Sequence, residues 1–407
     1  MKTDQFLPSL DDYEELIGAE TVDRIRRKAR SLIGQKVVHV NSTMYGGGVA
    51  EMLDPLSLLM NSLGIDTEWH AIQGTPDFFA VTKSIHNAIQ GAEFENLQRR
   101  MGVYEQVVAK NALRMHLARF DYVVIHDPQP LSLIKHFRKR CPWIWRCHLD
   151  LTHPNPDVWN YMTQAINLYD AMIVSAEFYR QNVSVPQRIF MPAIDPFSIK
   201  NQPMTEEQIE ERLKRYLIPT DLPLVVQISR FDRWKDPTGV IEAVKKVRKE
   251  INCTLVLLGN LASDDPEGTL IYQSLIDQKD DRIILISQED SQLVNALQRR
   301  AAVILQKSLR EGFGLTVAEA MWKGTPVIGG NVGGIRLQIQ DGQNGFLVST
   351  VDEAADRILR LLRDGKLRAE MGRKAHETVK EHFLLSRLLE QYVDLFNGFE
   401  IQFRLRP

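Results

Sequence analysis

The feature that most constrains this chain is a regular alternation of short apolar runs with segments of helical periodicity. The first series of apolar runs covers residues 36–42, 67–73, 121–127, 143–150 and 171–175. Continuous apolar runs rich in β-branched residues are typical of strands that are buried on both faces, and intervening helices make such strands parallel. The alternation therefore predicts an α/β protein built on a doubly wound parallel sheet.

A second series of the same kind predicts a second sheet. Its apolar runs cover residues 222–230, 253–260, 281–288, 302–308 and 325–330. A chain of 407 residues also exceeds what one hydrophobic core usually fills. We therefore expect two Rossmann-like domains with an interdomain cleft, because open α/β sheets bind ligands at the carboxyl ends of their strands.

Two prolines suggest where the domains divide. Pro192 and Pro196 interrupt regular structure between the two series. The C-terminal helical region is too long for one packed helix, so we expect it to break. The expected domains are an N-terminal one over 1–195, a C-terminal one over 196–384, and a last helix over 385–407 that returns to the first.

Charge and cysteine content exclude several classes of partner. Fifty basic and fifty-two acidic residues give a net charge of −2, which attracts neither nucleic acid nor anionic membrane. The three cysteines lack the spacing of a disulfide framework or a zinc site. We find no signal-like N-terminus and no apolar run long enough to span a membrane. The expected location is the cytoplasm.

A glycine-rich turn follows the first predicted strand. There Gly46, Gly47 and Gly48 open a helix, an arrangement that lets backbone N–H groups approach an anion closely. A dinucleotide fingerprint is excluded, because its third glycine would fall where Glu51 stands. A plain tight turn is the alternative for this segment alone.

Basic residues gather after the first strand of the second series. Arg230, Arg233 and Lys235 stand together at a strand end in a chain with no basic surplus. Arginine offers a planar fork and lysine a flexible point charge, a combination that suits a diphosphate. The alternative is a solvated loop before a helix that begins at Asp236 and Pro237.

Two glutamates eight residues apart frame the start of a short predicted helix. Glu311 precedes the helix and Glu319 lies within it, while Gly312 and Gly314 permit close backbone approach. Free N–H groups and the helix dipole attract phosphate at such a terminus. Eight residues at helical rise span roughly 12 Å, so one carboxylate would reach a sugar and the other a ribose across a diphosphate.

The E-x7-E spacing at Glu311 and Glu319, with R-x4-K at Arg230 and Lys235, resembles the retaining nucleotide-sugar glycosyltransferases of the GT-B fold. That group includes the sucrose and glycogen synthases. The resemblance assigns Glu311 to the donor sugar, Arg230 and Lys235 to the diphosphate, and Glu319 to the ribose. It also implies further donor-binding residues, namely Gly46, Gly47, Gly48, Ile286, Gln288, Gly312, Phe313, Gly314, Leu315 and Thr316.

The N-terminal half narrows the resemblance. The segments H-V-N-S-T-x-x-G-G-G-V-A-E, V-V-I-H-D-P-Q-P and W-R-C-H-L-D look like those of the trehalose glycosyltransferring synthases, and retaining trehalose phosphorylases look similar. By this resemblance His148 is an active-site histidine. We expect His126, Asp127, His148 and Asp150 to bind the acceptor. A packing role is the alternative for the histidines.

The resemblance implies reversible, retaining transfer of glucose from a nucleoside-diphosphate glucose to free glucose, which makes α,α-trehalose. Arg230, Lys235, Glu311 and His148 would be the catalytic residues. We expect no cofactor and no need for magnesium, because no Asp-x-Asp pair stands at a strand end. The expected partners are the small-molecule substrates, and a homodimer is left open.

The sequence leaves four alternatives open. A trehalose phosphorylase or another sucrose synthase-like glucosyltransferase would share the same motifs. A nucleotide-sugar epimerase would act on the donor without an acceptor. A non-catalytic sensor would bind the donor without turnover.

Overall fold

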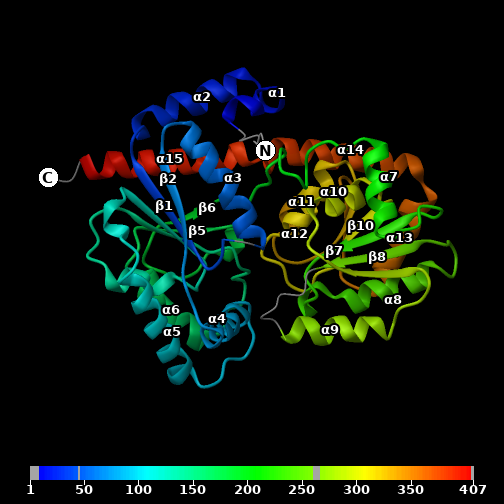
Figure 1. Ribbon diagram of the computed structural model, residues 1–407, viewed down its shortest axis with the longest axis horizontal. Coiled ribbons are helices and arrows are strands. Elements are labelled where there is room, and N and C mark those ends of the chain that lie inside the picture. The colour runs from blue at the N-terminus through cyan, green and yellow to red at the C-terminus, as the bar shows by residue number, and fades with distance from the viewer. Residues whose placement is uncertain (1–8, 45, 260–265, 405–407) are drawn as a thin grey trace. The chain divides into compact units, whose positions relative to one another are not determined.

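The computed structural model describes residues 9–44, 46–259 and 266–404. Contacts between Cα atoms divide the chain into two compact units (Figure 1). Unit 1 comprises residues 1–193 together with 385–407, and unit 2 comprises residues 194–384. Each unit is built on one six-stranded sheet in which every strand pair is parallel. The two sheets and their helices confirm the predicted α/β class.

Unit 1 alternates strands and helices and then receives the last helix of the chain. Its strands are β1 (Lys36–Asn41), β2 (Asp66–Ala71), β3 (Tyr122–His126), β4 (Trp143–Arg146), β5 (Ala171–Val174) and β6 (Gln187–Ile189). Its α-helices are α1 (Glu14–Ile17), α2 (Ala19–Ala29), α3 (Gly48–Ser62), α4 (Pro76–Ile89), α5 (Leu97–Ala112), α6 (Pro156–Ile166) and α15 (Leu385–Arg404). Short 3₁₀ turns lie at Leu10–Tyr13, Arg30–Leu32, Leu117–Arg119, Leu131–His136 and Glu177–Tyr179.

Unit 2 follows the same plan. Its strands are β7 (Leu224–Ile228), β8 (Thr254–Gly259), β9 (Ile283–Ser287), β10 (Val303–Gln306), β11 (Val327–Gly330) and β12 (Phe346–Val348). Its helices are α7 (Glu206–Arg215), α8 (Pro237–Val247), α9 (Pro266–Ile276), α10 (Ser291–Arg300), α11 (Leu315–Trp322), α12 (Ile335–Gln338), α13 (Val351–Arg363) and α14 (Gly365–His382). A 3₁₀ turn lies at Arg233–Lys235.

The central strands are buried along their whole length, as continuous apolar runs predict. Every residue of β3, β4, β7 and β10 is buried. Helices cover both faces of each sheet, and α15, red in Figure 1, runs beside α2 and α3 within unit 1. Removing this apolar surface from water supplies the main stabilisation, at about 25 cal/mol for each Å² buried.

Strand order places one topological switch point in each sheet. The orders are β2-β1-β3-β4-β5-β6 in unit 1 and β12-β11-β10-β7-β8-β9 in unit 2. The direction in which successive strands are added therefore reverses between β1 and β3, and again between β7 and β10. Open parallel sheets bind ligands beside such a point, at the carboxyl ends of the strands.

Several boundaries differ from the sequence expectations. The helix at 48–62 begins and ends as expected, and the long C-terminal helical region breaks at Asp364 and again after His382. The run 143–150 was expected to be one strand, but β4 ends at Arg146. The cause is local, because the N–H of His148 donates to the side chain of Asp127 and no longer to a neighbouring strand.

Candidate active site

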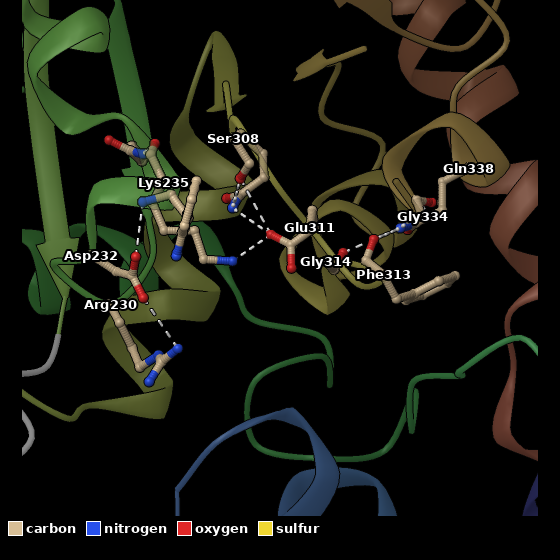
Figure 2. A network of polar contacts seen from close by, with 12 residues as sticks. Arg230, Asp232, Lys235, Ser308, Glu311, Phe313, Gly314, Gly334 and Gln338 are labelled. Atoms are coloured by element: carbon tan, nitrogen blue, oxygen red, sulfur yellow. Dashed lines mark hydrogen bonds and ion pairs between the residues drawn. The ribbon is translucent and has the colours of Figure 1, made fainter. Parts of the chain in front are cut away.

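The expected diphosphate and sugar residues meet at the switch point of unit 2. Arg230 and Lys235 follow β7, and Glu311 follows the neighbouring strand β10. Figure 2 shows the side chains of Lys235 and Glu311 pointing toward each other from these two strand ends. The strand order thus brings together two motifs that lie far apart in the sequence.

A direct ion pair joins Lys235 to Glu311. The Nζ of Lys235 contacts Oε2 of Glu311, and both side chains are largely buried. The amide of Gln306 and the hydroxyl of Ser308 donate to the same oxygen, each at 3.3 Å. Three donors therefore fix the carboxylate of Glu311 at the end of β10.

The loop that carries Lys235 is braced from several sides. Asp232 accepts a hydrogen bond from the N–H of Trp234 at 2.8 Å, and Gln227 donates to the carbonyl of Lys235 at 2.8 Å. Asp236 adopts a left-handed backbone with φ of 49° and caps α8 through the N–H of Gly239. An ion pair with the buried side chain of Lys307 holds Asp236 in place.

Arg230 is less constrained than Lys235. Its guanidinium lies 3.5 Å from the carboxylate of Asp232, and 48% of its side chain is exposed. Arg233, the third member of the expected basic cluster, stacks on the ring of Trp234 with its guanidinium carbon 4.5 Å from the ring centroid. Of the expected basic cluster, Lys235 is the member that contacts Glu311 at the end of β10, and Arg230 keeps an exposed side chain.

The turn before α11 needs glycine at its last position. Gly314 has φ of +81°, and a Cβ atom there would lie 3.2 Å from the Cγ of Glu311. Gln338 supports the turn by donating to the carbonyl of Phe313 at 2.6 Å, as Figure 2 shows. The first N–H groups of α11, at Leu315 and Thr316, have no carbonyl within the helix to receive them. This is the arrangement that attracts phosphate.

The span from Glu311 to Glu319 does not follow from helical rise alone. Residues 311–314 are not helical, so the rise of an α-helix applies only from Leu315 onward. Glu319 is the fifth residue of α11 and is 5% exposed. Its carbonyl accepts a hydrogen bond from Lys323 at 3.0 Å. Burial lowers the pKa of Lys323 to about 7, and the carboxylate of Glu319 opposes that shift.

The two residues expected near the base lie at the edge of the same sheet. Ile286 is buried in β9, which is the last strand of the order, and Gln288 follows that strand and is exposed. The N–H of Gln288 donates to the carbonyl of Gly259 at 3.0 Å. They are thus separated from Glu311 by β8 and β7 and do not join its hydrogen-bonded cluster.

The glycine turn stands at the switch point of unit 1. Gly46 and Gly47 have φ of +71° and +82°, and Gly48 begins α3. No atom lies within 4 Å of a Cβ built on Gly46 or Gly47. Their left-handed backbone, and not a close approach within the protein, is therefore what requires glycine at these two positions.

Histidines of unit 1 form a continuous chain of hydrogen bonds. His39 Nδ1 lies 2.9 Å from His126 Nε2, and His126 Nδ1 lies 3.0 Å from His148 Nε2. His126 is fully buried and has both ring nitrogens engaged, which favours a role in holding His148 over direct contact with an acceptor. Sequence reasoning missed His39, because its strand pairs with β3 only in the folded sheet.

The two aspartates of unit 1 support the loop that follows β4. Asp127 has φ of 62°, and its carboxylate accepts the backbone N–H of His148 at 2.8 Å. Burial raises the pKa of Asp127 to about 7. Asp150 is buried and accepts hydrogen bonds from both the N–H and the hydroxyl of Thr152. The expected acceptor residues thus lie at the end of β3 and in the loop that follows β4.

The described residues contain neither a candidate metal cluster nor a helix that could span a membrane. No group of three or more His, Cys, Asp or Glu side chains there could hold a metal ion. None of the helices in that part of the chain is both long and apolar enough to cross a membrane. The independence of the chemistry from magnesium stays a prediction.

Comparison with known proteins identifies both halves of the chain. Residues 39–181 match the family described as "Trehalose synthase, N-terminal domain", and residues 208–378 match "Glycosyl transferases group 1". The trehalose synthase of Thermococcus litoralis is 44% identical over 399 residues, which cover 96% of this chain and 97% of that protein. A trehalose phosphorylase of Pleurotus pulmonarius is 28% identical, over 86% of this chain and 55% of that protein.

Solved structures agree on the fold. A UDP-forming α,α-trehalose-phosphate synthase of Burkholderia xenovorans superposes with a TM-score of 0.73 over 90% of this chain and 100% of that structure, at 12% identity. At that identity the likeness speaks for the fold alone, and the fold is GT-B. Together with the relative that is 44% identical over nearly the whole chain, it confirms the resemblance that the motifs indicated. This chain therefore belongs to the trehalose synthase family of GT-B glycosyltransferases, whose common chemistry is trehalose-related glycosyl transfer.

Proposed function

We propose that this chain transfers glucose, with retention of configuration, from a nucleoside-diphosphate glucose to free glucose and so makes α,α-trehalose. The observation that carries the proposal is the convergence of Lys235, Arg230 and Glu311 on the switch point beside α11. Two cations and a helix N-terminus suit a diphosphate, and the adjoining carboxylate suits the hydroxyls of a sugar.

The cations act where charge develops. As the bond from the anomeric carbon to phosphate lengthens, negative charge grows on the leaving diphosphate. Arg230, Lys235 and the N-terminus of α11 would stabilise that charge, and such fixed electrostatic groups commonly supply the largest share of a rate enhancement. We propose that these groups take the place of a divalent metal.

The ion pair between Lys235 and Glu311 gives donor binding a specific consequence. Lys235 is proposed to meet the diphosphate, and Glu311 the sugar attached to it. One substrate molecule therefore offers new partners to both members of the pair at once. Because an unpaired buried charge is costly, a fragment that carries only one of the two groups should bind less favourably than the intact donor.

Unit 1 is proposed to supply the acceptor-side groups. His148 is partly exposed, and Asp127 and His126 fix its backbone and its ring. In the proposed reaction the acceptor hydroxyl attacks from the face that the diphosphate leaves. A departing phosphate oxygen takes the hydroxyl proton, so no side chain needs to act as the base.

The similarity to trehalose phosphorylases supports a second candidate, in which phosphate replaces the nucleoside diphosphate. Product analysis separates the two. The purified chain should be incubated with a panel of nucleoside-diphosphate glucoses, with and without glucose, and separately with trehalose and phosphate. We expect trehalose only when donor and glucose are both present. Rapid phosphorolysis of trehalose with no reaction of any nucleotide donor would favour the phosphorylase.

A further inference from the structure

Three histidines from neighbouring strands of unit 1 form one hydrogen-bonded chain. His39 lies in β1, His126 lies at the end of β3, and His148 follows β4. The ring centroids of His39 and His126 are 5.2 Å apart, and those of His126 and His148 are 5.3 Å apart. His148 is the partly exposed end of the chain, and the other two rings are fully buried.

All three imidazoles are neutral near pH 7. Burial lowers the pKa of His39 to about 3, and it lowers the pKa values of His126 and His148 well below the ordinary value. A neutral imidazole carries one proton, on one of its two nitrogens, and the other nitrogen accepts. A chain of three such rings that keeps both hydrogen bonds has only two proton arrangements.

The two arrangements differ at both ends of the chain. In the first, the inward arrangement, each N–H points toward the buried His39. His148 donates from Nε2, so its Nδ1 is a bare acceptor, and His39 carries an N–H at its buried Nε2. In the second, the outward arrangement, each N–H points toward the partly exposed His148. His39 and His126 donate from Nδ1, so His148 carries its proton on Nδ1 and the Nε2 of His39 is bare.

The buried end of the chain favours the outward arrangement. Within the described residues, Nε2 of His39, the hydroxyl of Tyr392 and all three nitrogens of Arg146 are buried without a hydrogen-bond partner. The ring of Tyr392 meets that of His39 edge-on at 5.6 Å, and the charge of Arg146 acts on the Tyr392 phenol. A guanidinium can only donate. The hydroxyl of Tyr392 can donate or accept, and the positive charge of Arg146 acts on its oxygen, so we infer that its proton is available to His39 and favours a bare Nε2 there.

The charged groups around the exposed end keep the rings neutral. Arg146 acts on both His126 and His148 and opposes a positive charge on either ring. Asp127 is engaged with the backbone N–H of His148 through Oδ1. The backbone and the ring of His148 are therefore held separately, by Asp127 and His126, and its Nδ1 is the ring nitrogen that has no recorded bond to the other two histidines.

We propose that His126 and His39 are positioning residues that hold the proton of His148 on Nδ1, so that His148 donates a hydrogen bond to a substrate oxygen. The substrate oxygen is a sugar hydroxyl or a phosphate oxygen, both of which accept. His148 then has no lone pair to offer as a general base. The part of this inference that concerns the substrate rests on the proposed function, whereas the tautomer is a property of the free protein.

Nitrogen NMR of the free protein tests the tautomer directly. The chain is labelled with ¹⁵N in the rings of its ten histidines, and the three signals are assigned by comparison with single variants. We expect His39, His126 and His148 each to carry the proton on Nδ1 near pH 7. A proton on Nε2 of His148, or rapid averaging between its two nitrogens, would overturn the inference.

Variants then link the tautomer to turnover. His126→Leu removes the donor to His148, so we expect a mixed tautomer at His148 and a fall in kcat of about tenfold, the size of one neutral hydrogen bond. His126→Asn can donate from a similar position and should restore most of kcat. His70→Leu is the matched control, because His70 bonds to Glu68 and is not one of the three hydrogen-bonded histidines. Unchanged kcat in a folded His126→Leu protein contradicts the positioning role.

The proposed function and the proposed tautomer of His148 can fail independently. If no nucleotide donor reacts with glucose, the proposed function fails while the NMR result still decides the tautomer. If trehalose forms but His148 carries its proton on Nε2, the positioning proposal fails and the function stands. Should His126→Leu not fold, the spectrum of the unmodified protein decides alone.

Discussion

Three neighbouring side chains hold the carboxylate of Glu311 in place. Lys235, Gln306 and Ser308 all contact the same carboxylate oxygen. Gln306 and Ser308 were not among the expected site residues, although the run Q-K-S, which ends two residues before E-G-F-G begins, places both at the strand end. Polar residues at the end of an apolar strand, next to a predicted site, were the signal that could have identified these two residues.

The two glutamates should respond differently when each becomes glutamine. Glu311 is proposed to contact the sugar, whose ring gains positive charge as the bond to phosphate lengthens, so Glu311→Gln should depress kcat. Glu319 should reach only the ribose, so Glu319→Gln should weaken binding of the nucleoside diphosphate by about 1 to 3 kcal/mol. Steady-state kinetics and calorimetry on both variants decide. The reverse pattern would show that the two roles are exchanged.

Arg230→Ala and Lys235→Ala should each lower kcat strongly, because the charge that these residues meet grows in the transition state. We expect the activation free energy to rise by about 2 to 4 kcal/mol in each variant. The same reasoning predicts that thorough chelation leaves the unmodified protein active. Kinetics of the two variants, and of the chelated protein, are the measurements. Normal kcat with only a raised donor KM, or activity that returns only with magnesium, would contradict this assignment.

At the level of elements, the turn before α11 sets the position of Glu311. Gly314→Ala forces a left-handed alanine and a Cβ into contact with Glu311. Gly342→Ala is the matched control, since Gly342 has φ of +74° with no atom within 4 Å of its Cβ. Both variants should lose about 1 to 2 kcal/mol of stability. Only Gly314→Ala should also lose kcat; an equal loss in both variants would show that the contact with Glu311 does not matter.

The elements that the sequence predicted best are those with long apolar or periodic signals. The strands β7 and β10 and the helix α3 stand where their patterns placed them. The three-residue strands β6 and β12 were missed, because Q-R-I and F-L-V are too short to show a period.

The site was predictable in part. Arg230, Lys235 and Glu311 could be named from motif spacing, and the strand order then explains why they meet. The chain from His39 to His148 could not be named, because it depends on which strands are neighbours and in which register. Residues 39 and 148 are far apart in sequence, and no local pattern reports that they share one hydrogen-bonded chain.

At the scale of the whole molecule, buried histidines make stability depend on pH. Burial lowers the pKa of His39 to about 3, whereas the unfolded chain titrates near 6.5. Between these values only the unfolded state takes up the proton, so acid favours unfolding. His126 and His148 act in the same direction, and Asp127, with its raised pKa, acts against them.

His39→Leu should therefore flatten this dependence. Removing one histidine removes the uptake of one proton on unfolding, so between roughly pH 4 and pH 6 the slope of the unfolding free energy should fall by about 1.4 kcal/mol per pH unit. Denaturant unfolding of both proteins across that range is the measurement. Parallel curves would mean that His39 is protonated in the folded state as readily as in the unfolded chain.

The proposed reaction is retaining transfer of glucose from a nucleotide donor to free glucose. NMR of the reaction, with a donor labelled with ¹³C at its anomeric carbon and unlabelled glucose, tests it most directly. We expect the label to appear in trehalose with the α configuration at both anomeric carbons. A β linkage at the labelled carbon, or a label that ends in free glucose or in an epimer of the donor, would rule out retaining transfer to glucose.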